Sequence, residues 1–253
     1  MHASRPQHRR RASASRLGTK LRLVCGRFAS TTPPDQLASY FGAEAPELLD
    51  DEARADYNVA PTRDVPVVRV REGDRRLDLL RWGLVPRWAK DLRIGSKMIN
   101  ARAETVATKN SFRSAFSRRR CIVAADGFYE WQRLTNEGGK PKKQPMFIHR
   151  ADGDPLAFAG LHERWTDAEG LREIHTCTII TTEANDMMAE IHNRMPVLLA
   201  PSDWDEWLDP DNHNDTDLQR LLVPAPDSLL SAYAVSDSVN SVKNNEPSLL
   251  DRV

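Results

Sequence analysis

Short apolar segments separated by turn residues constrain the fold of this chain more than any other feature of its sequence. Two of them, residues 65–70 and 77–80, flank Gly73 and Asp74. Apolar runs of this length on either side of a Gly-containing turn are typical of a β-hairpin. Further runs of strand length lie at residues 121–125, 146–149, 156–161 and 172–181. The sequence therefore predicts a protein rich in strands.

The predicted helices are short. Pro33, Pro34 and Asp35 are typical of a helix start, and Gly42 is typical of its end. Apolar side chains at helical spacing predict another helix within residues 103–116. Strands mixed irregularly with short helices are typical of an α+β protein. We expect one domain with a mostly antiparallel sheet that is curled toward a barrel and has short helices at its periphery.

Charge is unevenly distributed along the 253 residues, although the formal net charge is zero. Residues 1–24 carry seven basic residues and no acidic one, so they are predicted to be a disordered basic extension, and the domain is predicted to span residues 25–253. That remainder has a net charge of −7, yet residues 81–120 hold eleven basic and only two acidic residues. Such a stretch suggests a polyanion such as DNA as the partner, with a solvated basic face as the alternative.

Several classes of protein are disfavoured by composition. No window approaches the roughly 18 apolar residues that a membrane helix needs, so we expect no membrane partner. Cys25, Cys121 and Cys177 are odd in number and scattered, which argues against a disulfide framework and favours a reducing, intracellular setting. No two histidines or cysteines fall at ligand spacing, so we expect no metal and no cofactor.

Seven short segments in a fixed order carry a resemblance to a known family. They are CGRF at residues 25–28, YNVAP at 57–61, WGLVPRW at 82–88, NARAE at 100–104, DGFYEW at 126–131, IHNRMP at 191–196, and VS, VN and NNEP between residues 235 and 247. Each segment alone is a weak signal. Together they cover most of the chain, which resembles the SRAP (SOS response-associated peptidase) family of abasic-site-processing proteins.

The resemblance implies covalent capture of abasic sites in single-stranded DNA through an N-terminal cysteine, and a peptidase-like ability to unmask that cysteine. An α-amine, with a pKa of about 7.7–8.0, can form a Schiff base with the aldehyde of the ring-opened sugar. The neighbouring thiol, with a pKa of about 8.5, can then close onto the imine carbon and form a thiazolidine. An internal cysteine cannot begin this reaction, because its nitrogen lone pair is delocalised in an amide.

Cys25 departs from the family pattern because 24 residues precede it. One explanation is that translation starts at Val24, since a valine codon can serve as a bacterial start codon and is then read as methionine. A second is that the preceding residues are a cleaved transit peptide, because such peptides are rich in Arg and Ser and poor in acids. The third is that the protein cleaves itself before Cys25. A start at Val24 makes Cys25 the second residue, and its small side chain suits removal of the initiator methionine. All three explanations then leave Cys25 as the first residue.

The resemblance assigns catalytic roles to Cys25, Asn100, Glu130 and His192. Glu130 follows an apolar run and lies between two aromatic residues, a setting that should raise its pKa and suit it to proton transfer. His192 would move protons around the Schiff base, and Asn100 would hold the amine or the opened sugar. Without the resemblance, the residues themselves favour a surface glutamate at Glu130, a structural histidine at His192 and a turn residue at Asn100.

Six residues are expected to contact DNA. They are Arg27, Trp82, Trp88, Arg102, Trp131 and Arg194. The family match implies that Arg102 and Arg194 grip phosphates, for which a guanidinium is well shaped, and that Arg27 lines the same groove. The tryptophans would stack on bases, an interaction worth about 1–3 kcal/mol per base. Surface ion pairs and core packing are the alternatives.

Two other functions remain open from the sequence. One is a cysteine peptidase or N-terminal nucleophile hydrolase that uses Cys25 and His192, and the other is a single-stranded DNA-binding module without chemistry. The basic stretch at residues 81–120 favours DNA over a peptide. The expected partner is therefore single-stranded DNA containing abasic sites. We expect a monomer, located in the cytoplasm with the nucleoid if the source is bacterial.

Overall fold

The computed structural model describes residues 25–45, 55–135, 139 and 141–253. The predicted basic extension at residues 1–24 lies outside these described residues. No helix in the described ranges is long and apolar enough to span a membrane.

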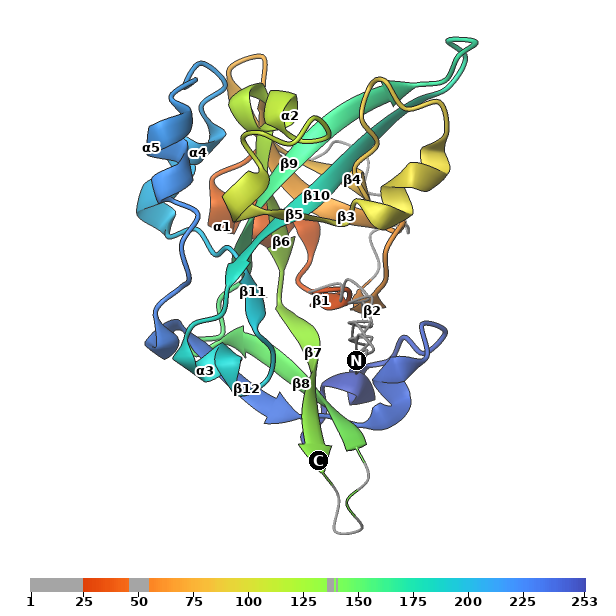
Figure 1. Cartoon of the computed structure of the whole chain (residues 1–253), viewed down its shortest axis with the longest axis vertical. Coiled ribbons are helices and arrows are strands. Elements are labelled where there is room, and N and C mark those ends of the chain that lie inside the picture. The colour runs from red at the N-terminus through yellow and green to blue at the C-terminus, as the bar shows by residue number, and fades with distance from the viewer. Residues whose placement is uncertain (1–24, 46–54, 136–138, 140) are drawn as a thin grey trace, which may run out of the picture.

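A closed barrel of five strands forms the centre of the molecule (Figure 1). Its strands are β3 (Asp64–Arg71), β4 (Asp74–Trp82), β6 (Arg120–Ala125), β9 (Leu156–Thr166) and β10 (Glu173–Glu183). They pair in the order β10-β4-β3-β6-β9, and β9 pairs back onto β10. Only the β4–β10 contact in this ring is parallel. The predicted α+β fold with a mostly antiparallel, barrel-like sheet is confirmed.

The predicted hairpin at residues 65–80 is also confirmed. Arg71, the last residue of β3, pairs with Asp74, the first residue of β4, so Glu72 and Gly73 form a two-residue turn. Their φ angles are 56° and 93°. Two consecutive positive φ angles match the right-handed twist of a hairpin, and glycine adopts the second of them without strain.

A second sheet packs beside the barrel and is antiparallel throughout. Its order is β12 (Leu230–Ala234), β8 (Pro141–Arg150), β7 (Gly127–Thr135), β1 (Phe28–Ser30) and β2 (Asp56–Val59). Two short strands extend the barrel sheet along β10. These are β5 (Asn100–Arg102), which is parallel to β10, and β11 (Arg194–Pro196), which is antiparallel to it.

The helices are short, as expected. They are α1 (Pro34–Phe41), α2 (Arg113–Arg118), α3 (Asp186–Ala189), α4 (Trp204–Leu208) and α5 (Asp215–Arg220). The predicted end of α1 is confirmed, because Gly42 caps it with a φ of 59°. The helix predicted for residues 103–116 is wrong over most of its length. A 3₁₀ turn, η2 (Ala103–Thr105), is followed by turns as far as α2, although Val106, Phe112 and Phe116 are all buried. Helical spacing of apolar residues is therefore satisfied here by a chain that turns several times.

The two largest apolar clusters lie on either side of the barrel wall, one outside the barrel and one inside it. Phe41, Phe116, Trp204 and Trp207 lie in the outer cluster, between the barrel wall and the helices. The inner cluster runs from Cys25 and its neighbours to residues inside the barrel, including Val67, Val123, Phe158, Cys121 and Cys177. All three cysteines are buried and free. Arg69 of β3 lies outside this cluster. Its guanidinium contacts Asp78 of β4, His162 of β9 and His175 of β10, so four strands contribute to one polar cluster.

Candidate active site around Cys25 and Glu130

The backbone nitrogen of Cys25 donates a hydrogen bond to Oε1 of Glu130 over 2.6 Å. Strand pairing explains this contact between residues that are far apart in the sequence. β1 and β7 are antiparallel, with Phe28 opposite Phe128, and the N–H of Tyr129 donates to the carbonyl of Arg27. Continuing this register toward the start of β1 places Gly26 opposite Glu130, and Cys25, the residue before Gly26, is then within reach of the Glu130 side chain. Cys25 itself has a φ of 47°, an unusual conformation for a residue with a side chain.

The neighbours of Glu130 fix the direction of its side chain. The Tyr129 hydroxyl donates to the carbonyl of Tyr57 over 2.7 Å, and the Trp131 indole N–H donates to Asn240 Oδ1 over 2.7 Å. Because successive side chains on a strand point to opposite faces, these two anchors hold Glu130 on the face where Cys25 lies.

Burial changes the acidity of Glu130. Only 4% of the residue is exposed. This burial raises the pKa of its carboxyl to about 7, while hydrogen bonds from the backbone N–H groups of Cys25 and Trp131 and the charge of Lys143 oppose the rise. The raised pKa expected from the sequence is present. A carboxyl with such a pKa can accept and return a proton near neutral pH.

The Cys25 thiol is not activated in this form of the chain. Complete burial raises its pKa well above the ordinary value, and the charge of Glu130 raises it further. Burial likewise raises the pKa of Cys121 and Cys177, so none of the three thiols has the lowered pKa of a reactive cysteine.

Asn100 begins β5, where it lies opposite Ile179 of β10. The residue before it, Ile99, belongs to the same apolar cluster as Cys25. The Trp82 indole N–H donates to the Ile99 carbonyl over 2.9 Å, which holds the chain in place directly before Asn100.

His192 follows α3, and its N–H donates to the Met188 carbonyl. Its Nδ1 accepts the Arg194 N–H over 3.2 Å, so the neutral ring carries its proton on Nε2. Gln132 of β7 donates to the Glu190 carbonyl over 3.1 Å and ties this loop to the strand of Glu130. The structure thus brings the segments that hold the four predicted catalytic residues around one apolar cluster.

The tryptophans predicted to contact DNA have different environments. Trp88 is 59% exposed and Trp131 is partly exposed, so a base could contact the exposed surface of either residue. Trp82 is completely buried, with its ring 5.0 Å from that of Phe28. The expectation that Trp82 stacks on bases is wrong, because both of its ring faces are enclosed by the core.

The predicted DNA-binding arginines also differ. Arg102 is exposed. Arg194 instead forms a bidentate ion pair with Glu104, at 2.6 and 3.1 Å, and donates to the Thr181 carbonyl. Arg27 donates to Asn58 Oδ1 and to the Val239 carbonyl. Arg194 and Arg27 therefore already have protein partners.

Asn58 is a structural residue that the sequence reasoning did not single out. It is 97% buried, since its exposed fraction is 3%. Its amide N–H groups donate to the carbonyls of Val239, Ser241 and Asn244. Asn58 thereby fastens the C-terminal segment to β2, and the polar residue inside the YNVAP motif was the signal for this.

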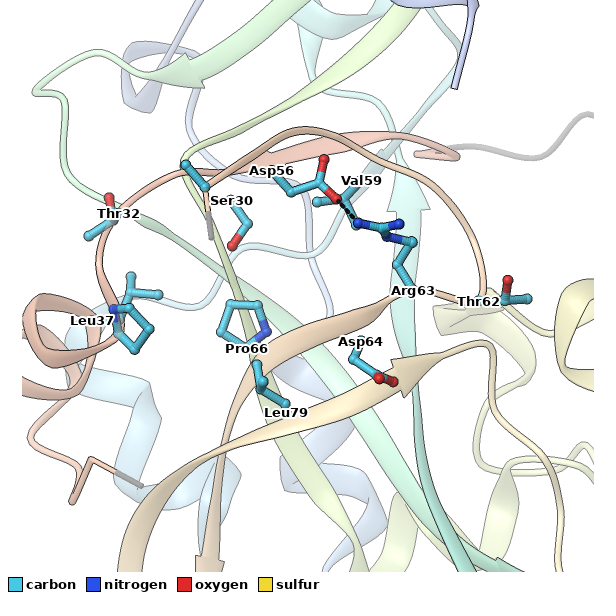
Figure 2. Close-up of a pocket in the computed structure, with 12 residues that line it drawn as sticks. Ser30, Thr32, Leu37, Asp56, Val59, Thr62, Arg63, Asp64, Pro66 and Leu79 are labelled. Carbon is cyan, nitrogen blue, oxygen red and sulfur yellow. Dashed lines mark ion pairs between the residues drawn. The ribbon is translucent and has the colours of Figure 1, made fainter. Parts of the chain in front are cut away.

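A cavity of about 380 Å³ lies apart from this site, between α1, β1, β2 and β3 (Figure 2). An ion pair of 3.3 Å between Asp56 and Arg63 lies along it. Its described lining includes none of the four predicted catalytic residues. Among the residues that the structure describes, no group of three or more His, Cys, Asp or Glu side chains could hold a metal ion.

Known proteins resemble this chain over nearly all of its described length. The model of the SOS response associated peptidase (SRAP) family matches residues 24–242. The abasic site processing protein YoqW of Bacillus subtilis (strain 168) is 45% identical over 229 residues, which are 90% of this chain and 99% of that protein. The abasic site processing protein YedK of Escherichia coli (strain K12) is 35% identical and covers 91% of this chain and 100% of its own length. A crystal structure of a protein from Bacteroides thetaiotaomicron superimposes with a TM-score of 0.80 at 26% identity, over 90% of this chain and 100% of that one.

Proposed function

Because the chain belongs to the SOS response associated peptidase (SRAP) family, we propose that it processes abasic sites in DNA, and that it does so by capturing them as a thiazolidine on Cys25. The observation that carries this proposal is the 2.6 Å contact between the Cys25 nitrogen and Glu130. The proposed partner is single-stranded DNA containing an abasic site, and the proposed acting form is a monomer in which Cys25 is the first residue.

In that form the Cys25 nitrogen is an amine rather than an amide. The ammonium gives a proton to Glu130, whose pKa of about 7 suits it to this exchange. The free amine then attacks the aldehyde carbon of the opened sugar and forms a carbinolamine. Glu130 returns its proton to the hydroxyl group, which leaves as water, and a protonated imine remains.

The thiazolidine forms when the Cys25 sulfur adds to the imine carbon. A C–S bond forms, the C=N π electrons move to nitrogen, and the thiol proton is transferred to the Glu130 carboxylate, so the step is balanced without a further reactant. Sulfur and nitrogen belong to one residue, so ring closure is intramolecular and gains from proximity.

His192 and Asn100 have supporting roles in this proposal. The Nε2–H of His192 is a hydrogen-bond donor, since its Nδ1 accepts from Arg194. It would donate to the oxygen that leaves as water. The Asn100 amide would hold the opened sugar, at a position supported by the contact between Trp82 and Ile99.

For DNA contact we propose the exposed Trp88 and Arg102 first, together with the partly exposed Trp131. Trp88 and Trp131 would stack on bases beside the missing one, which is independent of sequence. Arg27 and Arg194 would contribute positive charge from positions that Asn58 and Glu104 already fix.

The proposed peptidase-like activity uses the same contact. When the peptide bond before Cys25 is hydrolysed, a water oxygen becomes bonded to the carbonyl carbon, and the Cys25 nitrogen leaves and needs a proton. Glu130 lies next to that nitrogen and would supply it. A start at Val24 or a cleaved leader would reach the same product without this step.

The decisive experiment compares three proteins. They are a form in which an initiator Met is followed directly by Cys25, the full chain, and the short form with Cys25→Ala. Each is incubated with single-stranded DNA carrying one abasic site and is run on a denaturing gel without added reductant. We expect a shifted band from the short form and none from Cys25→Ala, while a shifted band from the full chain would indicate self-cleavage.

A matched control and a clear negative complete this test. The short form with Cys121→Ala should still give the shifted band, because Cys121 is buried inside the barrel. Absence of the band with every form would refute covalent capture. The remaining candidates would be the hydrolase and the DNA-binding module without chemistry. Binding to undamaged single-stranded DNA would distinguish between them.

A further inference from the structure

The β7–β8 hairpin extends well beyond the sheet that it belongs to (Figure 1). β1 pairs with β7 only at Gly127 and Phe128, and β12 pairs with β8 only over residues 146–150. Residues 131–135 and 141–145, here named the β7–β8 arm, form strand pairs with each other and with no third strand in the described part of the chain. A two-stranded ribbon on its own is marginally stable in water, so a partner that packs along it would stabilise it.

The β7–β8 arm is positively charged. Arg133, Lys142 and Lys143 are exposed, and the arm contains no acidic residue. Arg133 lies directly opposite Lys143 in the strand register. Like charges at directly opposed positions repel and destabilise a strand pair. Within the described ranges neither side chain forms an ion pair with a carboxylate, so a bound anion would reduce the repulsion between them.

The two cations share a face with an aromatic ring. Strand alternation places Trp131, Arg133 and Lys143 on the same side of the ribbon. The contact of Trp131 with Asn240 fixes the indole at the base of that face. An aromatic side chain beside a line of cations is the combination that binds single-stranded nucleic acid, because bases stack on the ring and the cations follow the phosphates.

The first residue of this face, Trp131, follows Glu130 in the chain and lies on the opposite face of β7. The positive charge of Lys143 also acts on Glu130, where it opposes the larger effect of burial on the pKa of that carboxyl. The arm therefore adjoins the strand segment of Glu130 and lies within electrostatic reach of that carboxyl.

We infer that Arg133 and Lys143 are a docking site for the phosphate backbone of single-stranded DNA on one side of the abasic nucleotide. The inference rests on the proposed function, because it assumes that the strand enters the site of Cys25 and Glu130. The arm binds without reading bases, holds the strand beside Trp131 and takes no part in the covalent step.

Salt dependence of DNA binding by the full chain tests this docking site. The substitutions Arg133→Gln and Lys143→Gln are combined, and fluorescence anisotropy with an undamaged single-stranded oligonucleotide is measured over a series of salt concentrations. Each phosphate contact contributes about 0.7 to the slope of log K against log salt for single strands. Loss of two contacts should reduce the magnitude of that slope by about 1.4.

Two controls distinguish an effect of these two positions from a general effect of lost positive charge. Arg164→Gln with Arg172→Gln removes the same charge from exposed positions outside both the arm and the basic stretch at residues 81–120, and this pair should leave the slope unchanged. Arg133→Lys with Lys143→Arg keeps the charge and should keep the slope. An unchanged slope in the arm variant, or an equal decrease in the variant with Arg164→Gln and Arg172→Gln, overturns the inference.

Failure of the proposed function gives a different result. Binding to undamaged DNA needs no Cys25 chemistry, so the slope can be read even if no adduct ever forms. In the short form that begins at Cys25, the arm variant should still form the full amount of adduct at saturating abasic DNA. If the wild type forms the adduct and the arm variant does not do so at saturation, the arm acts in the covalent step and the docking role is refuted.

Discussion

The backbone nitrogen of Cys25 and Oε1 of Glu130, 105 residues apart in the chain, lie 2.6 Å apart in the structure. The pairing of β1 with β7 produces this contact. It links the residue that would supply both nucleophiles to a buried carboxyl whose pKa is raised to about 7. The following predictions test what this arrangement and its supports contribute.

Replacing Glu130 by Gln should slow adduct formation strongly. Gln can still accept the hydrogen bond from the Cys25 nitrogen, but it cannot take a proton, so proton transfer to and from the amine is lost. Positioned acids and bases typically accelerate reactions by about 10²–10⁴-fold. We expect a decrease of about 100-fold or more in the rate of adduct formation by the short form at pH 7. The exposed Glu169→Gln is the control, and equal rates for Glu130→Gln and the wild type would contradict a proton-transfer role.

The same substitution should stabilise the protein in a pH-dependent way. The pKa of Glu130 is about 7 in the folded state and near 4.5 when burial is lost. Between these values the folded state binds more protons than the unfolded state, so the free energy of unfolding contributed by Glu130 falls as pH rises from about 4.5 to 7. Gln does not carry this penalty. Urea unfolding should show Glu130→Gln more stable than the wild type by on the order of 3 kcal/mol at pH 8, with little difference at pH 4.5.

An opposite pH dependence would show that the folded protein favours the Glu130 carboxylate. Such a result would mean that the hydrogen bond from Cys25 outweighs burial at this position.

Two tryptophan substitutions should separate support of the site from contact with DNA. Trp82→Phe removes the hydrogen bond to the Ile99 carbonyl before Asn100, so it should slow adduct formation while leaving affinity for undamaged single-stranded DNA unchanged. Trp88→Ala removes an exposed ring, so it should weaken that affinity by about 1–3 kcal/mol if the ring stacks on one base. Anisotropy and gel assays on both variants give the two readouts. Weaker DNA binding by Trp82→Phe with an unchanged melting temperature would contradict its buried role.

Arg120 should be essential for stability rather than for DNA contact. Its guanidinium is buried and donates to the backbone carbonyls of Phe116, Ser117, Trp207, Asp209 and Asn212. Each buried carbonyl left without a donor costs about 1–3 kcal/mol. Arg120→Met should therefore lower the free energy of unfolding by more than about 3 kcal/mol.

Arg120→Lys should rescue little of that loss, because an ammonium cannot reproduce the planar set of donors. The neighbouring Arg118→Gln changes an exposed side chain and serves as the control in the same unfolding experiment. A loss for Arg120→Met no larger than that of the control would refute this assignment.

Much of the fold could be predicted from local pattern. The hairpin at Glu72 and Gly73, the end of α1 at Gly42 and the buried strand β6 all follow from short-range signals, because a turn or cap is determined by a few neighbouring residues. The helix expected within residues 103–116 failed for the same reason. Apolar spacing there is compatible with a helix and with turns that bury the same side chains, and only packing against the barrel selects between them.

The sequence by itself determined the family, the identity of the candidate catalytic residues and the unusual position of Cys25 after 24 residues, since these depend on the order of residues alone. The tertiary structure determined which groups surround those residues and how far each side chain is buried. Closure of the barrel depends on the parallel pairing of Trp82 with Cys177, which no local pattern encodes. Trp82 is enclosed and Trp88 exposed although both belong to one motif, because burial depends on distant chain segments that cover one ring and not the other. The pKa of Glu130 is likewise a property of its surroundings, since it is the folding of β1 and its neighbours over this carboxyl that removes it from water.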